Sequence, residues 1–126
     1  MIHIDRQSRV PVFEQIKNEL MTLISLGVLT PHSKLPSIRQ VAAETGVNIN
    51  TVKKAFSELE SHGVIYSVPG TGSYVSADAL ADENLRRTAF QEVETAVLAA
   101  KAKGIALAEV LSTVHTLYGE EVNNNA

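Results

Sequence analysis

The strongest constraint on the fold of this chain is a pair of short amphipathic segments joined by a tight turn. Residues 38–45 and 49–62 each carry apolar side chains at a helical spacing, and each follows a residue suited to capping a helix N-terminus, Ser37 and Asn48. Gly46 lies between them, where a left-handed residue ends one helix and lets the next begin. This arrangement predicts a helix-turn-helix.

The flanking segments extend that prediction. Residues 12–26 have the periodicity of a helix. Residues 64–68 are β-branched and aromatic, 69–72 form a Pro-Gly turn, and 73–75 form a return strand. The order of helix, short helix, turn, helix and β-hairpin predicts a winged helix-turn-helix. Residues 2–5 alternate weakly and fit either an edge strand or an arm.

The C-terminal part is rich in Ala, Leu and Glu and predicts two further helices. The first follows Asp78 or Asp82 and ends near Lys103, and the second spans 107–118. A polar tail at 123–125 is expected to fray. The predicted fold is mainly α with a small β-hairpin: a winged helix-turn-helix domain followed by a two-helix C-terminal dimerisation hairpin.

Two helices totalling about 40 residues cannot close a core by themselves. They must pack on the first domain, on a second copy of the chain, or on both. A second copy is favoured because it would bury an apolar stripe and supply two-fold symmetry. The residues expected at this dimer interface are Phe90, Val93, Val97, Leu107, Leu111, Val114 and Leu117.

The net charge of −3 argues, for the whole chain, against a nucleic-acid binder, but the charge is unevenly distributed. Residues 1–77 carry seven Lys/Arg and six Asp/Glu, whereas residues 78–126 carry four Lys/Arg and eight Asp/Glu. The first balance is +1 and the second is −4. The change of sign predicts two domains with different partners, 1–77 for DNA and 78–126 for dimerisation.

Several classes of function are disfavoured by composition. The chain has no cysteine, and its four histidines lack metal-ligand spacing, so we expect neither a metal nor a cofactor. No catalytic constellation is present, which argues against an enzyme. No apolar run approaches the length of a membrane span, and the N-terminus lacks the regions of a signal peptide, so we expect a cytoplasmic protein without a membrane partner.

A helix-turn-helix places the start of its second helix in the major groove of DNA. In this chain that segment offers hydrogen-bonding groups and two cations: Asn48, Asn50, Thr51, Lys53 and Lys54. An Asn side chain can bond bidentately to adenine, and Thr and Lys commonly contact phosphates. An ordinary capped surface helix would fit the same residues.

Two other elements fit a DNA-binding face. Arg39 follows the Ser37 cap, where free backbone amides and a cation would suit a phosphate; the alternative is a surface ion pair with Glu44. The turn at 69–73 contains two glycines that permit a close approach to DNA, although a plain hairpin turn would look the same.

Four motifs in fixed order resemble the DNA-binding domain of GntR-family bacterial transcription regulators. They read LPSIRQVA at 35–42, GVNxNTV at 46–52, LExxGxIY at 59–66 and GxGxYV at 70–75. The N-terminal segment and the short C-terminal part are similar to the YtrA-type subfamily.

The resemblance implies a homodimeric repressor of an inverted-repeat operator in double-stranded DNA. The positions that match the family's DNA contacts are Ser37, Arg39, Asn48, Asn50, Thr51, Lys53, Gly70, Thr71 and Gly72. Two residues depart from the family pattern. Ile49 stands where many members carry a base-reading Arg, and it could instead touch a thymine methyl group. Thr71 replaces a commonly basic wing residue.

A second interpretation keeps the fold and changes the partner. The near-neutral charge of residues 1–77 also fits a winged-helix protein-interaction module without specific DNA binding. For a repressor, we expect release by a small-molecule effector of unknown identity, through altered spacing of the two winged domains at a hinge near residues 76–82. The sequence specifies neither the operator nor the regulated genes.

Overall fold

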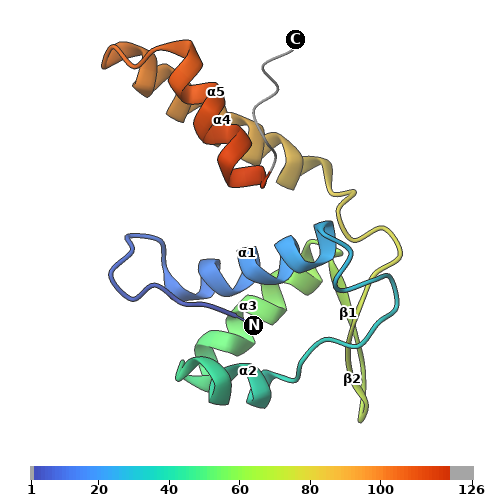
Figure 1. Ribbon diagram of the computed structural model, residues 1–126. Helices are drawn as coiled ribbons and strands as arrows, with labels where there is room; N and C mark the ends of the chain where they lie inside the picture. The colour runs from blue at the N-terminus through green and yellow to red at the C-terminus, as the bar shows by residue number, and fades with distance from the viewer. Residues whose placement is uncertain (1, 120–126) are drawn as a thin grey trace. The chain divides into compact units, whose positions relative to one another are not determined.

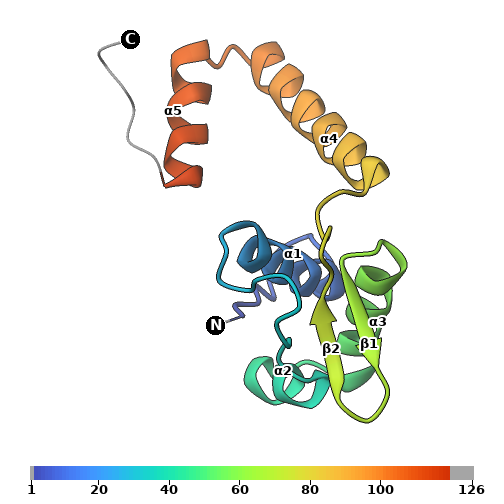
Figure 2. The same cartoon turned by 90° about the vertical axis from the view of Figure 1, so that its right-hand side faces the viewer.

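The computed structural model describes residues 2–119 and divides the chain into two compact units. The first unit ends at Glu83 and the second begins at Asn84. Figures 1 and 2 label the helices and strands of both units. The predicted tail at 123–125 lies outside the described residues. The elements are α1 (Val12–Ser25), α2 (Ile38–Thr45), α3 (Ile49–Ser61), β1 (Ile65–Val68), β2 (Gly72–Val75), α4 (Glu83–Ala102) and α5 (Leu107–Tyr118).

Helix α2 begins and ends as its sequence predicts, and α3 begins as predicted but ends at Ser61, one residue earlier than expected. The Ser37 hydroxyl accepts a hydrogen bond from the Gln40 amide at 3.0 Å, and the Gln40 side chain accepts one from the Ser37 amide at 2.8 Å. This reciprocal capping box fixes the start of α2. Gly46 ends α2 at a φ of 69°, and the Asn48 side chain caps α3 by accepting from the Asn50 amide at 2.8 Å.

The β-hairpin is a two-stranded antiparallel sheet in which Ile65 pairs with Val75 and Val68 pairs with Gly72. Its turn is therefore residues 69–71, one residue shorter than the sequence predicts. A third segment pairs with β2, because the Leu35 amide donates to the Ser73 carbonyl at 2.9 Å. The loop before α2 is thereby fixed against the hairpin.

The core of the first unit lies between α1, α2, α3 and the base of the hairpin. The predicted inward face of α3 is confirmed: Val52, Ala55, Phe56 and Leu59 are all buried. The other buried apolar residues of this core include Ile16, Leu20, Leu35, Val41, Val47, Val64, Ile65 and Val75. Helix α3 is thus packed on its apolar side, which leaves its polar side for another partner.

Residues 2–5 form an arm, not an edge strand. Ile2 is buried, and the Arg6 guanidinium donates to the Thr45 and Gly46 carbonyls, each at 3.1 Å. The Asp5 amide donates to the Gln15 side chain at 2.8 Å. The arm therefore contacts the start of α1. Arg6, which follows it, hydrogen-bonds the turn between α2 and α3.

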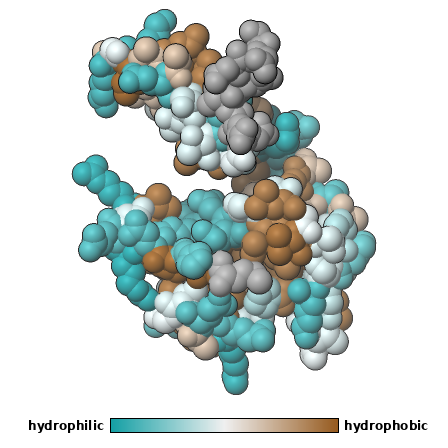
Figure 3. Space-filling view, in the orientation of Figure 1, coloured by the Kyte–Doolittle hydropathy of each residue, from teal (hydrophilic) through white to brown (hydrophobic). Residues whose placement is uncertain are grey.

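The second unit consists of α4 and α5, and neither helix contains a buried residue. Apolar side chains lie exposed on both, visible as brown surface in Figure 3. The two predicted helices are confirmed, with α4 one residue shorter at its end than expected. Among residues 2–119, no helix is long and apolar enough to cross a membrane. The predicted fold class, mainly α with one small hairpin, is confirmed.

Candidate nucleic-acid interface

Three elements of the first unit bring the sequence-predicted DNA-binding residues to one side. The start of α3, helix α2 and the tip of the β1–β2 hairpin all lie along the lower edge of this unit in both ribbon views (Figures 1 and 2). This edge is the surface a helix-turn-helix would present to DNA.

The exposed side of α3 carries Asn48, Asn50 and Lys53, with Thr51 half-buried beside them. Within residues 2–119, the side chains of Asn50, Thr51 and Lys53 make no hydrogen bond or ion pair. The Asn48 amide oxygen is used as the helix cap, so its NH₂ group remains as the donor. Ile49 lies among these polar groups with 38% of its surface exposed.

Lys54 points differently from Lys53. Its ammonium nitrogen lies 3.9 Å from the centre of the Phe13 ring on α1, which is cation–π geometry. The two neighbouring lysines therefore have different environments. Lys53 makes no hydrogen bond or ion pair within residues 2–119, whereas Lys54 contacts Phe13 on α1.

Arg39 lies exposed in the first turn of α2. The alternative ion pair with Glu44 does not form: no salt bridge to Arg39 exists in the described part of the chain. A Glu44 carboxylate oxygen instead accepts a hydrogen bond from the Ile2 amide at 3.1 Å. The Ser37 hydroxyl accepts the cap bond, so Ser37 orients α2 while it remains exposed at this edge.

The turn of the hairpin is stabilised within itself. The Thr71 amide and hydroxyl both donate to the Val68 carbonyl, each at 3.0 Å. Gly70 and Gly72 have φ values of 77° and 139°, which L side chains rarely adopt. Thr71 is exposed but committed to the turn, so the tip offers backbone and no charge of its own.

Sequence reasoning missed one cation at this turn, Lys34. It pairs with Tyr74 across an isolated antiparallel bridge, and its side chain lies over Gly72. The signal that could have located it is weak, because Lys34 lies 38 residues before Gly72 and only the fold brings the two together.

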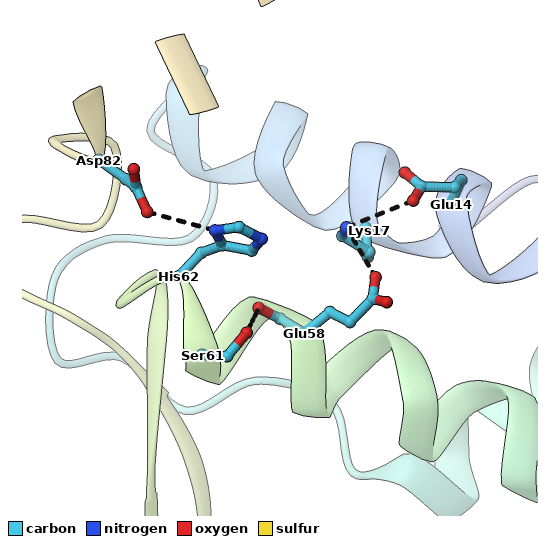
Figure 4. A network of polar contacts seen from close by, with 6 residues as sticks. All are labelled: Glu14, Lys17, Glu58, Ser61, His62 and Asp82. Atoms are coloured by element: carbon cyan, nitrogen blue, oxygen red, sulfur yellow. Dashed lines mark hydrogen bonds and ion pairs between the residues drawn. The ribbon is translucent and has the colours of Figure 1, made fainter. Parts of the chain in front are cut away.

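A polar network fixes α3 against α1 (Figure 4). The buried Lys17 ammonium lies 2.9 Å from a Glu58 carboxylate oxygen and 3.5 Å from one of Glu14. The hydrogen bond from Lys17 lowers the pKa of Glu58 below its ordinary value, because it stabilises the ionised carboxylate. In the same view, His62 Nδ1 lies 3.2 Å from an Asp82 carboxylate oxygen, which holds the segment after the hairpin on α3.

No group of three or more His, Asp or Glu side chains in residues 2–119 could hold a metal ion. His62 is the C-terminal cap residue of α3, as its place before Gly63 predicts. The chemistry available at the site is therefore hydrogen bonding and positive charge.

A winged helix-turn-helix with such a face defines a class of DNA-binding proteins, and comparison with known proteins specifies the family. Residues 13–75 match the model of the bacterial regulatory proteins of the gntR family. The chain belongs to the GntR family, whose members are transcription regulators and not enzymes.

Two relatives from Bacillus subtilis (strain 168) illustrate the match. The chain is 43% identical to the HTH-type transcriptional repressor YtrA over 79 residues, which cover 63% of this chain and 61% of YtrA. It is 32% identical to the HTH-type transcriptional regulator YhcF over 111 residues, which cover 87% of this chain and 92% of YhcF. The alignment with YtrA thus spans less than two thirds of that protein.

Solved structures share the fold. A transcriptional antiterminator from Listeria monocytogenes EGD-e superposes with a TM-score of 0.84 at 29% identity, covering 98% of both chains. YtrA from Sulfolobus acidocaldarius gives a TM-score of 0.61 at 35% identity, over 75% of this chain and 97% of that one. The DNA-binding domain of AraR in complex with operator ORR3 gives 0.53 at 31% identity, over 59% of this chain and 89% of that one.

Proposed function

We propose that this chain is a homodimeric transcriptional repressor that binds an inverted-repeat operator in double-stranded DNA and is released by a small-molecule effector. The observation that carries the proposal is the structural difference between the two units. The first has a closed core and an unpartnered polar edge, and the second has apolar helices without a core. The protein would act in the cytoplasm, where the DNA of a bacterium lies.

The DNA-binding face of this proposal lies on three elements. Asn48, Asn50 and Thr51 on α3 read bases and position the helix in the major groove, and Lys53 neutralises a phosphate. Arg39 neutralises a second phosphate at the start of α2, next to the cap residue Ser37. The wing, Gly70 to Gly72, approaches the backbone of the duplex. Lys54 supports the face indirectly, by joining α3 to α1 through Phe13.

Complexes of a relative support this reading. The DNA-binding domain of AraR has been solved on operators ORR3 and ORE1, with 31% and 30% identity to this chain. We carry operator binding over to this chain because the two share the fold, and because this chain has exposed polar groups on α3, the helix that a helix-turn-helix places in the major groove.

The second unit supports dimerisation through exposed apolar surface. All seven residues predicted for the dimer interface lie exposed on α4 and α5, from 42% for Val97 and Val114 to 79% for Leu117. Burying such a side chain contributes about 1.5–3 kcal/mol, so leaving seven in water is strongly unfavourable. A second copy is the occupant we propose, since a two-fold axis would pair two winged domains with the two halves of an inverted repeat.

Release by an effector would act on the connection between the units. The predicted hinge region, residues 76–82, is held on the first unit by the Ser76 amide, which donates to Val64, and by the Asp82 contact with His62. We therefore place the movable point of this mechanism at the end of this region, just before α4 begins.

Selection of bound duplexes from random DNA tests the proposal. The full chain should enrich an inverted repeat, and binding should weaken steeply with salt. Arg39→Ala with Lys53→Ala should weaken binding and lower the salt slope by about two. Lys103→Ala, just after the end of α4, is the matched control, and it should leave the slope unchanged. Repeating the selection with candidate metabolites would identify an effector.

The competing interpretation, a protein-interaction module, makes the opposite prediction for the same experiment. Selection would then enrich no sequence, and the double variant would bind duplexes as the wild type does. Either result would contradict operator recognition and would leave the fold and the family assignment unchanged.

A further inference from the structure

The wing of this protein has no charge of its own. Residues 65–75, which include both strands and the turn, contain no Lys or Arg. A wing that follows a phosphate backbone draws its affinity mainly from cations and backbone amides. The tip amide of Thr71 is already bonded to the Val68 carbonyl, so the wing needs a cation from elsewhere.

Lys34 lies in a distant part of the sequence, and backbone pairing places it beside the wing. The Leu35 amide donates to the Ser73 carbonyl at 2.9 Å, and the Val75 amide donates to the Ser33 carbonyl at 3.0 Å. These bonds flank Lys34 and fix it beside Tyr74 in β2. The loop before α2 thus acts as a short third strand of the hairpin, and it presents Lys34 next to the turn.

Gly72 leaves room for the Lys34 side chain. A Cβ atom on residue 72 would lie 2.8 Å from Cε of Lys34 and 3.7 Å from its ammonium nitrogen. Carbon atoms in contact are ordinarily about 3.5–4.0 Å apart, so the lysine stem lies in the space that any side chain would take. The glycine therefore does two things: it adopts a φ of 139°, and it admits the lysine to the start of β2.

The Lys34 ammonium is available to a ligand. The residue is exposed, and no carboxylate among residues 2–119 forms a salt bridge with it. Lys17, by contrast, is buried between two carboxylates, Lys54 lies over Phe13, and Arg6 caps α2. Lys34 thus belongs with Arg39 and Lys53 among the cations of this unit that are not used within the fold.

We propose that Lys34 is the phosphate-binding cation of the wing, supplied in place of a basic residue in the turn itself. This assignment rests on the proposed DNA-binding function and adds a residue to it. A cation in this role contributes to binding of any duplex and carries no sequence preference.

The test measures binding of the full chain to its selected operator and to a scrambled duplex of equal length, by fluorescence anisotropy across a series of salt concentrations. Lys34→Met keeps the apolar stem over Gly72 and removes the charge. We expect it to weaken binding about 3- to 10-fold at moderate salt, equally on both duplexes, and to lower the salt slope by about one. Lys34→Arg should retain the slope, and Lys103→Met, just after the end of α4, should behave as the wild type.

Three outcomes would overturn the assignment. If the wild type binds DNA but Lys34→Met has an unchanged salt slope, Lys34 does not bind a phosphate, and the proposed function is unaffected. A loss confined to the operator would make Lys34 a base-reading residue and not a phosphate contact. A wild-type chain that binds neither duplex overturns both this assignment and the proposed function. Thermal unfolding of Lys34→Met, expected to match the wild type, guards against a folding defect.

Discussion

The two units of this protein have similar kinds of apolar side chains but use them in opposite ways. In the first unit, α1, α2, α3 and the hairpin enclose Leu20, Val41, Val52 and Leu59, which are fully buried. In the second, α4 and α5 also carry apolar side chains at a helical spacing, yet no residue of either helix is buried. Periodicity shows which side of a helix is apolar, but it does not show what covers that side.

The difference has a physical origin in the number of elements. Three helices and a hairpin can surround a common interior, whereas two helices leave most of their apolar surface in water. We therefore expect the first unit to fold alone, and we propose that a partner covers the apolar surface of the second.

The largest expected effect comes from the core of the first unit. Leu59→Ala removes a fully buried side chain from α3 and should lower the free energy of unfolding by about 2–5 kcal/mol, because a cavity remains. Leu117→Ala, at a residue 79% exposed in the single chain, should cost far less in a monomeric preparation. Urea denaturation measures both, and equal losses would refute the contrast between the units.

The next effect concerns the second unit in the proposed dimer. Leu111→Asp places a charge on the apolar stripe of α5 and should raise the dimer dissociation constant at least about 100-fold, or about 2.7 kcal/mol. Ser112→Asp, on the same helix but away from the stripe, is the matched control and should associate as the wild type does. Sedimentation velocity measures both, and an unaffected Leu111→Asp dimer would place the interface elsewhere.

A smaller effect should be confined to the first unit. Glu58→Gln removes the carboxylate nearest the buried Lys17 ammonium and should destabilise the unit by about 1 kcal/mol at pH 7. The effect is small because Glu58 is partly exposed, and water screens the ion pair. The matched control is Glu19→Gln on α1, for which little change is expected. Urea denaturation at several pH values measures the difference.

The pH dependence of this effect has a definite sign. The pKa of Glu58 is lowered in the folded state by the hydrogen bond from Lys17. Its contribution is therefore present above the unfolded pKa of about 4.3 and is lost as pH falls through the lower folded value. The gap between wild type and Glu58→Gln should close in acid, and a gap that widens there would contradict this assignment.

The smallest effect tests base recognition at the start of α3. If the exposed Ile49 side chain contacts a thymine methyl group, Ile49→Ala should weaken operator binding by about 0.8 kcal/mol, roughly fourfold. Replacing that thymine with uracil should weaken wild-type binding by a similar factor and should not weaken Ile49→Ala further. Independent, additive losses would show that the two groups do not touch.

Local signals predicted most of the fold. The bounds of α2 and α5 agree with the sequence prediction. Ser37 and Gly46 mark the two ends of α2, and Gly119 marks the end of α5. The sequence predicts a hairpin turn that is one residue too long, because Gly72 still pairs with Val68 at a φ that propensity does not anticipate.

The candidate site was less predictable than the fold. The polar face of α3 follows from its apolar face, so Asn50 and Lys53 could be placed from periodicity. The different settings of Lys53 and Lys54 depend on the position of Phe13 in another helix. Lys34 reaches the wing only through pairing between distant segments, which no local pattern encodes.

The central claim is that the first unit recognises DNA and the second joins two copies. The most direct measurement is the stoichiometry and affinity of the full chain and of residues 1–83 on the selected operator, by sedimentation with labelled duplex. We predict two full chains for each inverted repeat, and a folded, monomeric 1–83 fragment that binds at least about 100-fold more weakly yet still prefers the operator half-site to scrambled DNA. A fragment that dimerises and binds as tightly as the full chain would contradict the account.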